Sequence, residues 1–336
     1  MINGHGDDLF AFDGKIEHNF SSNVYSRLDL TPLKDFLAGR IDCLDSYPEP
    51  EPTRLERRIS DWIEVPHHNV MVTAGATDAI YNIAQAWTGC HSCILQPTFS
   101  EYADACRINR HRITNIGDIA DIPDDVDMIW ICNPNNPTGK VIPRDTIFQM
   151  AKYFDGVPIV IDQAYEDYTE EELIHPRECI RLENVILLKS LTKRFAVPGL
   201  RVGYMIGHKR LIYKVKSVRK PWSVSTQAID GGIFLINHAS EFQIPTRQLI
   251  EEANRVMKEL QDFGIFPYNI ETSTNFFLAR LPFGQKACDL KKYLAENFGI
   301  LIRDASNFHG LFENHFRIAV QTPEENDLLI NAIKSW

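Results

Sequence analysis

Apolar positions alternate between helical and strand spacing from about residue 53 onward. Leu55, Ile59 and Trp62 recur at helical spacing, and residues 76–87 predict a second helix. Short apolar runs predict strands at 92–95, 128–132, 159–161, 185–188 and 202–206. Most gaps between these runs hold helical stretches such as 147–154. Because strands that alternate with helices usually pair in parallel, the pattern predicts an α/β fold with a parallel sheet covered by helices on both faces.

The pattern changes after about residue 240. A long helical stretch at 242–263 is followed by two further helical stretches and by short apolar runs at 275–280, 300–303 and 316–320. This second part predicts a smaller α+β domain. The first thirty residues have no clear periodicity and predict an arm. We therefore expect an N-terminal arm at 1–30, a large domain at 31–238 and a small C-terminal domain at 239–336.

Charge and hydropathy narrow the possible partners. The chain carries 35 basic and 45 acidic residues, a net charge of −10, and such a chain repels nucleic-acid phosphates. The densest basic segment, 209–220, is typical of the solvated face of a helix. No apolar run approaches the roughly 20 residues that a membrane span needs. The first residues do not resemble a signal peptide. We expect a cytoplasmic protein that binds neither nucleic acid nor membrane.

The seven cysteines are an odd number and do not predict a disulfide scaffold. Cys90 and Cys93 form a single C-x-x-C pair, and no second ligand pair lies at a spacing suited to zinc. The pair also precedes a predicted strand, whereas a thioredoxin-like redox pair opens a helix. The sequence therefore predicts no metal site.

One segment concentrates an amine, an arginine and two hydroxyls. Ser190-Leu-Thr-Lys-Arg-Phe-Ala-Val-Pro-Gly-Leu-Arg201 begins where the strand at 185–188 ends, which is where α/β sheets place ligands. Hydroxyls and an arginine can hold a phosphate. Lys193 can form an imine with an aldehyde if burial or nearby cations lower its pKa. By itself, the segment is more typical of a solvated turn than of a binding site.

Other predicted strand ends carry complementary groups. The strand at 128–132 leads into a polar turn in which Asn136 can donate a hydrogen bond to a phenolate-like oxygen. Asp162 and Tyr165 follow the strand at 159–161, and a carboxylate beside a pyridine nitrogen keeps that nitrogen protonated. Gly75, Ala76 and Thr77 open a helix whose free N–H groups suit a phosphate. Taken singly, each motif is also typical of a helix cap or a common turn.

Together and in this order, the motifs resemble those of the class I/II aminotransferase family of fold-type I pyridoxal-phosphate (PLP) enzymes. The resemblance extends from about residue 5 to the end of the chain. It implies the PLP-dependent transferase-like fold, α/β with a large domain built on a mostly parallel central sheet and a smaller α+β C-terminal domain. It also implies PLP as cofactor and a homodimer with shared active sites.

The resemblance assigns a role to each matching residue. Lys193 would be the Schiff-base lysine, and Asp162 would pair with the pyridine nitrogen. Asn136 and Tyr165 would bind the ring oxygen, and Tyr102 would stack on the ring, although it could instead be a core aromatic, a role for which Phe99 is the better candidate. The cofactor phosphate would be held by Gly75, Ala76, Thr77, Ser190, Thr192 and Arg201. Tyr47 would reach this phosphate from the partner subunit.

Within the family, the sequence most resembles two branches with phosphorylated substrates, L-threonine O-3-phosphate decarboxylases and histidinol-phosphate aminotransferases. In both, Arg317 would bind the substrate α-carboxylate and Arg303 its phosphate, although either arginine could instead form a surface ion pair. His5 and Asn23 would help to bind the substrate. The Thr-Lys and Pro-Gly pairs around Lys193 favour the decarboxylase branch, which belongs to cobalamin biosynthesis. The start, His-Gly-Asp-Asp, departs from that branch by two added carboxylates.

We therefore expect a small phosphorylated amino acid as substrate, and decarboxylation in preference to transamination. A non-enzymatic PLP-sensing regulator is a remote alternative, since such proteins carry a DNA-binding module for which this chain has no room. A nucleotide-binding α/β protein would need a glycine-rich turn after its first strand, and neither G-x-G-x-x-G nor G-x-x-x-x-G-K-[ST] is present there.

Overall fold

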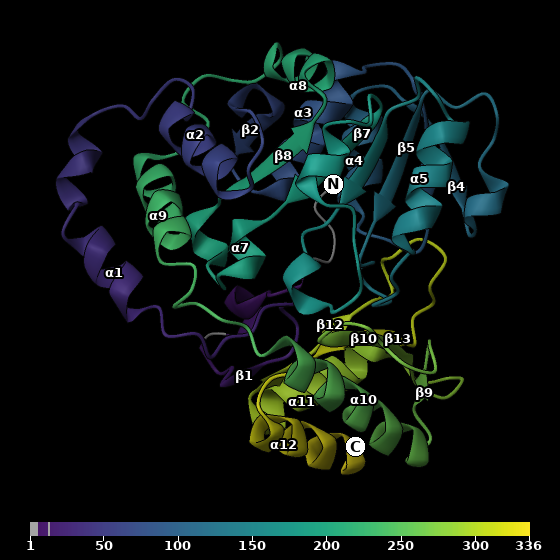
Figure 1. Ribbon diagram of the computed structural model, residues 1–336. Coiled ribbons are helices and arrows are strands. Elements are labelled where there is room, and N and C mark those ends of the chain that lie inside the picture. The colour runs from purple at the N-terminus through teal and green to yellow at the C-terminus, as the bar shows by residue number, and fades with distance from the viewer. Residues whose placement is uncertain (1–5, 13) are drawn as a thin grey trace.

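A seven-stranded sheet forms the centre of the chain in the order β2-β8-β7-β6-β5-β3-β4 (Figure 1). The computed structural model describes residues 6–12 and 14–336. The strands are β2 (Val70–Thr73), β3 (His91–Leu95), β4 (Arg112–Ile116), β5 (Met128–Cys132), β6 (Ile159–Asp162), β7 (Val185–Lys189) and β8 (Gly203–Gly207). The neighbouring strands β7, β6, β5, β3 and β4 pair in parallel, as the alternating pattern predicts.

Strand β8 departs from the expected parallel sheet, because it runs antiparallel to both β7 and β2. A parallel connection usually crosses the face of the sheet through a helix. Residues 190–202, between β7 and β8, hold only the four-residue helix α7 (Leu191–Arg194) and the three-residue 3-10 turn η6 (Pro198–Leu200), and neither is long enough to cross that face. The chain therefore returns directly. The apolar pattern also missed β2 and β4, of which β4 is an edge strand with several exposed positions.

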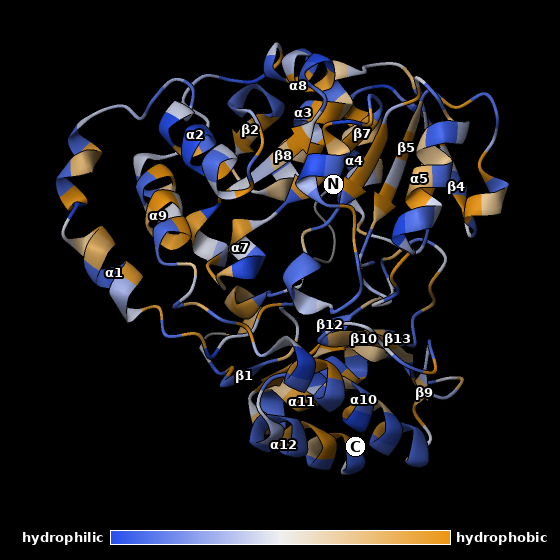
Figure 2. Ribbon diagram, in the orientation of Figure 1, coloured by the Kyte–Doolittle hydropathy of each residue, from blue (hydrophilic) through white to orange (hydrophobic). Residues whose placement is uncertain are grey.

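Alternating side chains of each strand feed two separate cores. Ile129 and Ile131 of β5 join the core beneath α2, α5, α6 and α9, whereas Met128 and Trp130 join the core beneath α3, α4 and α8. Figure 2 shows the apolar strands between helices whose outer faces are polar. The helices are α1 (Thr31–Ala38), α2 (Thr53–Trp62), α3 (Ala76–Ala86), α4 (Glu101–Ile108), α5 (Arg144–Tyr153), α6 (Pro176–Cys179), α8 (Lys209–Lys216) and α9 (Thr226–Asn237).

A second lobe lies below this sheet in Figure 1, built on a sheet of order β12-β13-β10-β9. Its strands are β9 (Phe266–Pro267), β10 (Phe276–Arg280), β12 (Arg303–Asp304) and β13 (His315–Ala319), and its helices are α10 (Thr246–Asp262), α11 (Ala287–Phe298) and α12 (Pro323–Lys334). The three helices share one apolar core with β10 and β13. The exact domain limits stay a prediction.

The arm is folded between the two lobes. Strand β1 (His18–Asn19) pairs in parallel with β11 (Ile300–Leu301), and Phe20 is fully buried in the core of the second lobe.

The other short 3-10 turns are η1 (Leu9–Phe12), η2 (Ile41–Asp45), η3 (His67–Asn69), η4 (Ile119–Asp121) and η5 (Glu166–Tyr168). No helix within the described ranges is long and apolar enough to cross a bilayer.

Candidate active site

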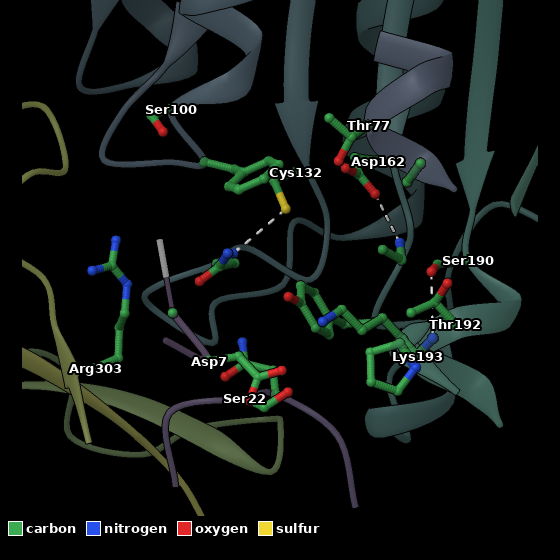
Figure 3. Close-up of a pocket in the computed structure, with 18 of the residues that line it drawn as sticks. Asp7, Ser22, Thr77, Ser100, Cys132, Asp162, Ser190, Thr192, Lys193 and Arg303 are labelled. Carbon is green, nitrogen blue, oxygen red and sulfur yellow. Dashed lines mark hydrogen bonds between the residues drawn. The ribbon is translucent and has the colours of Figure 1, made fainter. Parts of the chain in front are cut away.

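A pocket opens where the carboxyl ends of the parallel strands face the second lobe (Figure 3). Residues from both lobes and from the arm line it. The structure brings together these residues that the sequence singled out: Asn23, Ala76, Thr77, Tyr102, Asn136, Asp162, Tyr165, Ser190, Thr192, Lys193, Arg201, Arg303 and Arg317. The motifs, which lie far apart in the sequence, therefore meet in one cavity.

The other three residues that the sequence singled out, Gly75, Tyr47 and His5, are described separately from the pocket lining. Gly75 does not line the cavity itself, but it lies directly against the Arg201 guanidinium. Tyr47 lies outside the pocket, with an exposed fraction of 87%, and its ring lies 5.7 Å from that of Trp222. His5 falls outside the described residues.

Lys193 lies on α7, directly after β7. The Ser190 hydroxyl caps this short helix by accepting a hydrogen bond from the Lys193 N–H at 3.3 Å. The Lys193 amine lies 5.8 Å from the centre of the Tyr165 ring. Burial, together with the nearby Arg317 and Arg201, lowers the pKa of Lys193 to about 8, although Asp7 and Asp162 oppose the shift. The amine is therefore neutral in part near physiological pH, the form in which a lysine acts as a nucleophile.

Asp162 ends β6 opposite Cys132 of β5 and is buried. The Tyr102 hydroxyl donates to one carboxylate oxygen at 2.8 Å, and the Ala164 N–H donates to the other at 2.9 Å. Burial raises the pKa of Asp162, while these two hydrogen bonds and the Lys193 charge oppose the shift. The Tyr102 ring is buried and stacks on Trp130, with the ring centres 5.7 Å apart.

The N-terminus of α3 forms a cradle with Arg201. Gly75 has a positive φ of 88°, and a Cβ built there would lie 2.7 Å from Nη2 of Arg201. The first N–H groups of a helix are free to bind an anion. Thr77, Ser190 and Thr192 line the same pocket. A guanidinium, several hydroxyls and a helix N-terminus can all donate hydrogen bonds to a phosphate group.

Two arginines project from paired strands of the second lobe. Arg303 of β12 and Arg317 of β13 are directly paired in the antiparallel register, and both are buried. Arg317 donates to the Asn136 side-chain oxygen at 2.5 Å and to the Ser21 carbonyl. Arg303 donates to the Asp304 carbonyl at 2.5 Å and to the Asn307 side chain at 2.6 Å. Burial lowers the pKa of both arginines to about 10. Both remain charged, so this wall of the pocket favours anions.

Comparisons with known proteins agree with this arrangement. The family model for aminotransferase class I and II matches residues 15–333. The chain belongs to the aminotransferase class I and II family. This family is PLP-dependent, so the protein is a PLP-dependent enzyme. The sequence-based prediction of the family is therefore confirmed.

Proteins similar to this aminotransferase-family enzyme include threonine-phosphate decarboxylases and histidinol-phosphate aminotransferases. The crystal structure of L-threonine-O-3-phosphate decarboxylase from Porphyromonas gingivalis superposes with a TM-score of 0.91 at 34% identity, over 95% of this chain and 98% of that one. Threonine-phosphate decarboxylase of Salmonella typhimurium is 25% identical, over 94% of this chain and 90% of its own. Histidinol-phosphate aminotransferase of Ruminiclostridium cellulolyticum is 28% identical, over 86% and 83%. The fold-type I prediction is confirmed.

The arm of this family member contributes more to the pocket than the sequence indicated. Gly6, Asp7, Ser21 and Ser22 line the cavity beside Asn23. In the described part of the chain, neither polar atom of the buried Asn23 side chain has a hydrogen-bond partner. An unsatisfied buried amide costs stability unless something binds it. Sequence reasoning missed these four arm residues because the arm has no periodic pattern of apolar positions from which its contacts could be predicted.

Cysteines lie both inside and outside the site. Cys132 lines the pocket, and burial raises its pKa to about 12, so its thiol is neutral. The sequence could have indicated Cys132 as a site residue, because it lies at the end of a predicted strand. Cys90 Sγ lies 3.3 Å from His111 Nδ1. The two residues directly precede β3 and β4, respectively, so they lie at the amino ends of these strands, away from the pocket at the carboxyl ends. Among the described residues, no three His, Cys, Asp or Glu side chains are grouped as metal ligands would be.

Proposed function

We propose that this enzyme binds PLP at Lys193 and decarboxylates a small phosphorylated amino acid, L-threonine O-3-phosphate. One observation carries the substrate class. The charged pair Arg303 and Arg317 faces the same cavity as Lys193, so the pocket offers two cationic groups to a ligand with two anionic ends. The similarity to threonine-phosphate decarboxylases supports the reaction.

The residues present fit the cofactor. The cradle between Gly75 and Arg201 has room only for a glycine at position 75, and it supplies donors suited to the PLP phosphate. Gly75, Ala76, Thr77, Ser190, Thr192 and Arg201 would hold that phosphate. Asp162 would hold a proton at the pyridine nitrogen, Asn136 and Tyr165 would bind the ring oxygen, and Tyr102 would border the ring. When bound, PLP supplies an electron sink for a bond broken at the substrate Cα.

The chain's own groups would then orient the substrate. Arg317 would bind the α-carboxylate, Arg303 the substrate phosphate, and the unsatisfied Asn23 amide would donate to one of these groups. His5, which falls outside the described residues, would help to bind the substrate, as the resemblance implies. In decarboxylation the bond between Cα and the carboxylate breaks, CO₂ leaves and Cα takes up a proton. The Lys193 amine, with a pKa of about 8, is suited to deliver that proton.

Transamination is the second candidate, favoured by the similarity to histidinol-phosphate aminotransferases. The Cα–H bond would break instead, with Lys193 moving that proton. The two reactions differ in which bond to the substrate Cα is oriented to break. That orientation depends on how Arg303 and Arg317 together hold the substrate.

Two measurements test the proposal. Purified enzyme with added PLP should show the visible absorbance band of the bound cofactor, and Lys193→Ala should lose it without unfolding. Incubation with L-threonine O-3-phosphate should release CO₂ without any amino acceptor. No band in the wild-type protein would refute the cofactor assignment. Inertness toward this substrate, with 2-oxoglutarate formed from glutamate and imidazole-acetol phosphate, would assign the aminotransferase reaction instead.

We also propose that the active enzyme is a homodimer in which Tyr47 reaches the partner's cofactor phosphate. The exposure of Tyr47 in the single chain supports this proposal, since its side chain is accessible to a partner subunit, as a shared site requires. Mixing inactive Lys193→Ala and weakened Tyr47→Ala subunits should restore activity above that of either variant alone. No gain on mixing would contradict the shared site.

A further inference from the structure

The one-turn segment η5 (Glu166–Tyr168) contacts the lysine-bearing segment at three points. The Glu166 carboxylate accepts from the Lys189 amine, at the end of β7. The Asp167 carboxylate pairs with Arg194, the residue after Lys193. The Tyr168 hydroxyl donates to the Lys193 carbonyl at 3.0 Å. Three consecutive residues therefore hold the chain before, at and after the lysine.

The same segment is also tied to the arm and to the second lobe. The Tyr168 hydroxyl accepts a hydrogen bond from the Tyr25 N–H at 2.9 Å, two residues beyond Asn23. The Tyr168 ring is fully buried in the apolar core that α10, α11 and α12 share. The Asp167 carbonyl accepts from the Thr246 hydroxyl at 2.7 Å, at the first residue of α10. One hydroxyl group thus joins the arm to the lysine segment.

The main chain at Lys193 needs such support because the hydrogen bonds from the Thr192 and Lys193 N–H groups are long. Helix α7 has only four residues. The Lys193 N–H reaches Ser190 Oγ at 3.3 Å, and the Thr192 N–H reaches the Val202 carbonyl at 3.3 Å. Both distances lie at or beyond the long end of the range for N–H···O hydrogen bonds. The bond from Tyr168 is shorter than either, and its donor belongs to a side chain fixed by packing.

We propose that Tyr168 is a positioning residue whose hydroxyl fixes the Lys193 main chain against the arm and the second lobe. The amine is thereby kept inside the pocket among Asp7, Asp162, Arg201 and Arg317. The catalytic consequence rests on the proposed function of Lys193, whereas the positioning itself does not.

The test compares Tyr168→Phe with Tyr153→Phe in the cofactor-free protein. Both changes remove one hydroxyl, and Tyr153 is an exposed residue on α5 whose hydroxyl donates only to Asp124 at 3.2 Å among the described residues. Acylation of Lys193 as a function of pH, followed by mass spectrometry, reports the pKa of its amine. We expect a midpoint near 8 in the wild type and in Tyr153→Phe. In Tyr168→Phe we expect it about one unit higher, because a less confined amine is better solvated.

Kinetics of the PLP-loaded enzyme supply the second measurement. Tyr168→Phe should lower kcat about tenfold, the size expected for one lost hydrogen bond that fixes a reacting group, with little change in KM. Asp167→Asn, which removes the pairing charge for Arg194, should shift both values in the same direction. An unchanged acylation midpoint, accompanied only by a lower melting temperature, would show a merely structural role and overturn the proposal. Failure of the wild type to bind PLP would refute the proposed function and leave the acylation result intact.

Discussion

Removing the Tyr102 hydroxyl tests the electrostatics of the site most directly. This hydroxyl donates to Asp162 at 2.8 Å in a region where both residues are buried. Tyr102→Phe keeps the ring that stacks on Trp130 and removes only the donor. The Ala164 N–H stays on the other carboxylate oxygen. The substitution therefore isolates one hydrogen bond to a buried charge.

The structure fixes the sign of the effect. Burial already makes the pKa of Asp162 higher in the folded than in the unfolded chain. The contribution of such a group favours the folded state below its ordinary pKa and is lost as the pH rises through the folded pKa. Losing the Tyr102 donor raises the folded pKa further. A hydrogen bond to a charged group contributes about 2 kcal/mol and one between neutral groups about 1 kcal/mol, so the variant should lose about 2 kcal/mol at high pH and about 1 kcal/mol at low pH.

Urea unfolding of the cofactor-free protein from roughly pH 4 to pH 8 measures this difference. The Asp162→Asn background serves as control, since no charge remains there for Tyr102 to stabilise. In that background we expect Tyr102→Phe to lower the free energy of unfolding by the same amount at every pH. An equal cost at both ends of the pH range in the wild-type background would refute the proposed charge on Asp162.

Three further predictions concern the anion and amine groups. Gly75→Ala should weaken PLP binding, measured by fluorescence titration, because its Cβ displaces Arg201; Gly89→Ala, which has a similar positive φ of 83° but no described atom within 4 Å of its Cβ, should leave the affinity unchanged. Lys193→Met should raise the free energy of unfolding of the cofactor-free protein by at most about 3 kcal/mol below pH 8. Because the folded pKa lies below the ordinary value of 10.5, this gain should vanish as the pH rises through 10.5. Arg303→Gln should raise KM for the phosphorylated substrate roughly tenfold or more, with a smaller effect on kcat in steady-state assays.

The sequence predicted the parallel strands and their ends well, because both depend on local pattern. Strands β5, β6 and β7 are continuous apolar runs, since helices cover both faces of the sheet. Asp162 ends one of these strands and Lys193 follows another, so their meeting at the carboxyl ends of the strands could be predicted from chain order alone. The resemblance to known enzymes then gave each residue a role that geometry alone would not.

Other features depend on contacts that no local pattern encodes. The reversal at β8 follows from the short α7 and η6 turns, which the apolar run at 202–206 does not reveal. The arm packs through Phe20 and through backbone pairing with β11, which lies about 280 residues away in sequence. Helix α9 was missed because two glycines interrupt its pattern, at Gly231 and Gly232. A Cβ at position 232 would lie 2.9 Å from the Leu55 side chain, so a larger residue there would force Leu55 to shift.

The choice of substrate finally rests on the charge of the pocket. Among the described residues that line the pocket, the cationic side chains of Lys193, Arg201, Arg303 and Arg317 outnumber the two acidic ones, Asp7 and Asp162. Burial lowers the pKa of Lys193 and of both second-lobe arginines, so these charges destabilise the protein until anions reach them. The cofactor phosphate would neutralise the Arg201 side of the cavity, while the charges of Arg303 and Arg317 would still face the space left for the substrate. A substrate with a carboxylate alone would satisfy one of the pair, whereas a phosphorylated amino acid would satisfy both.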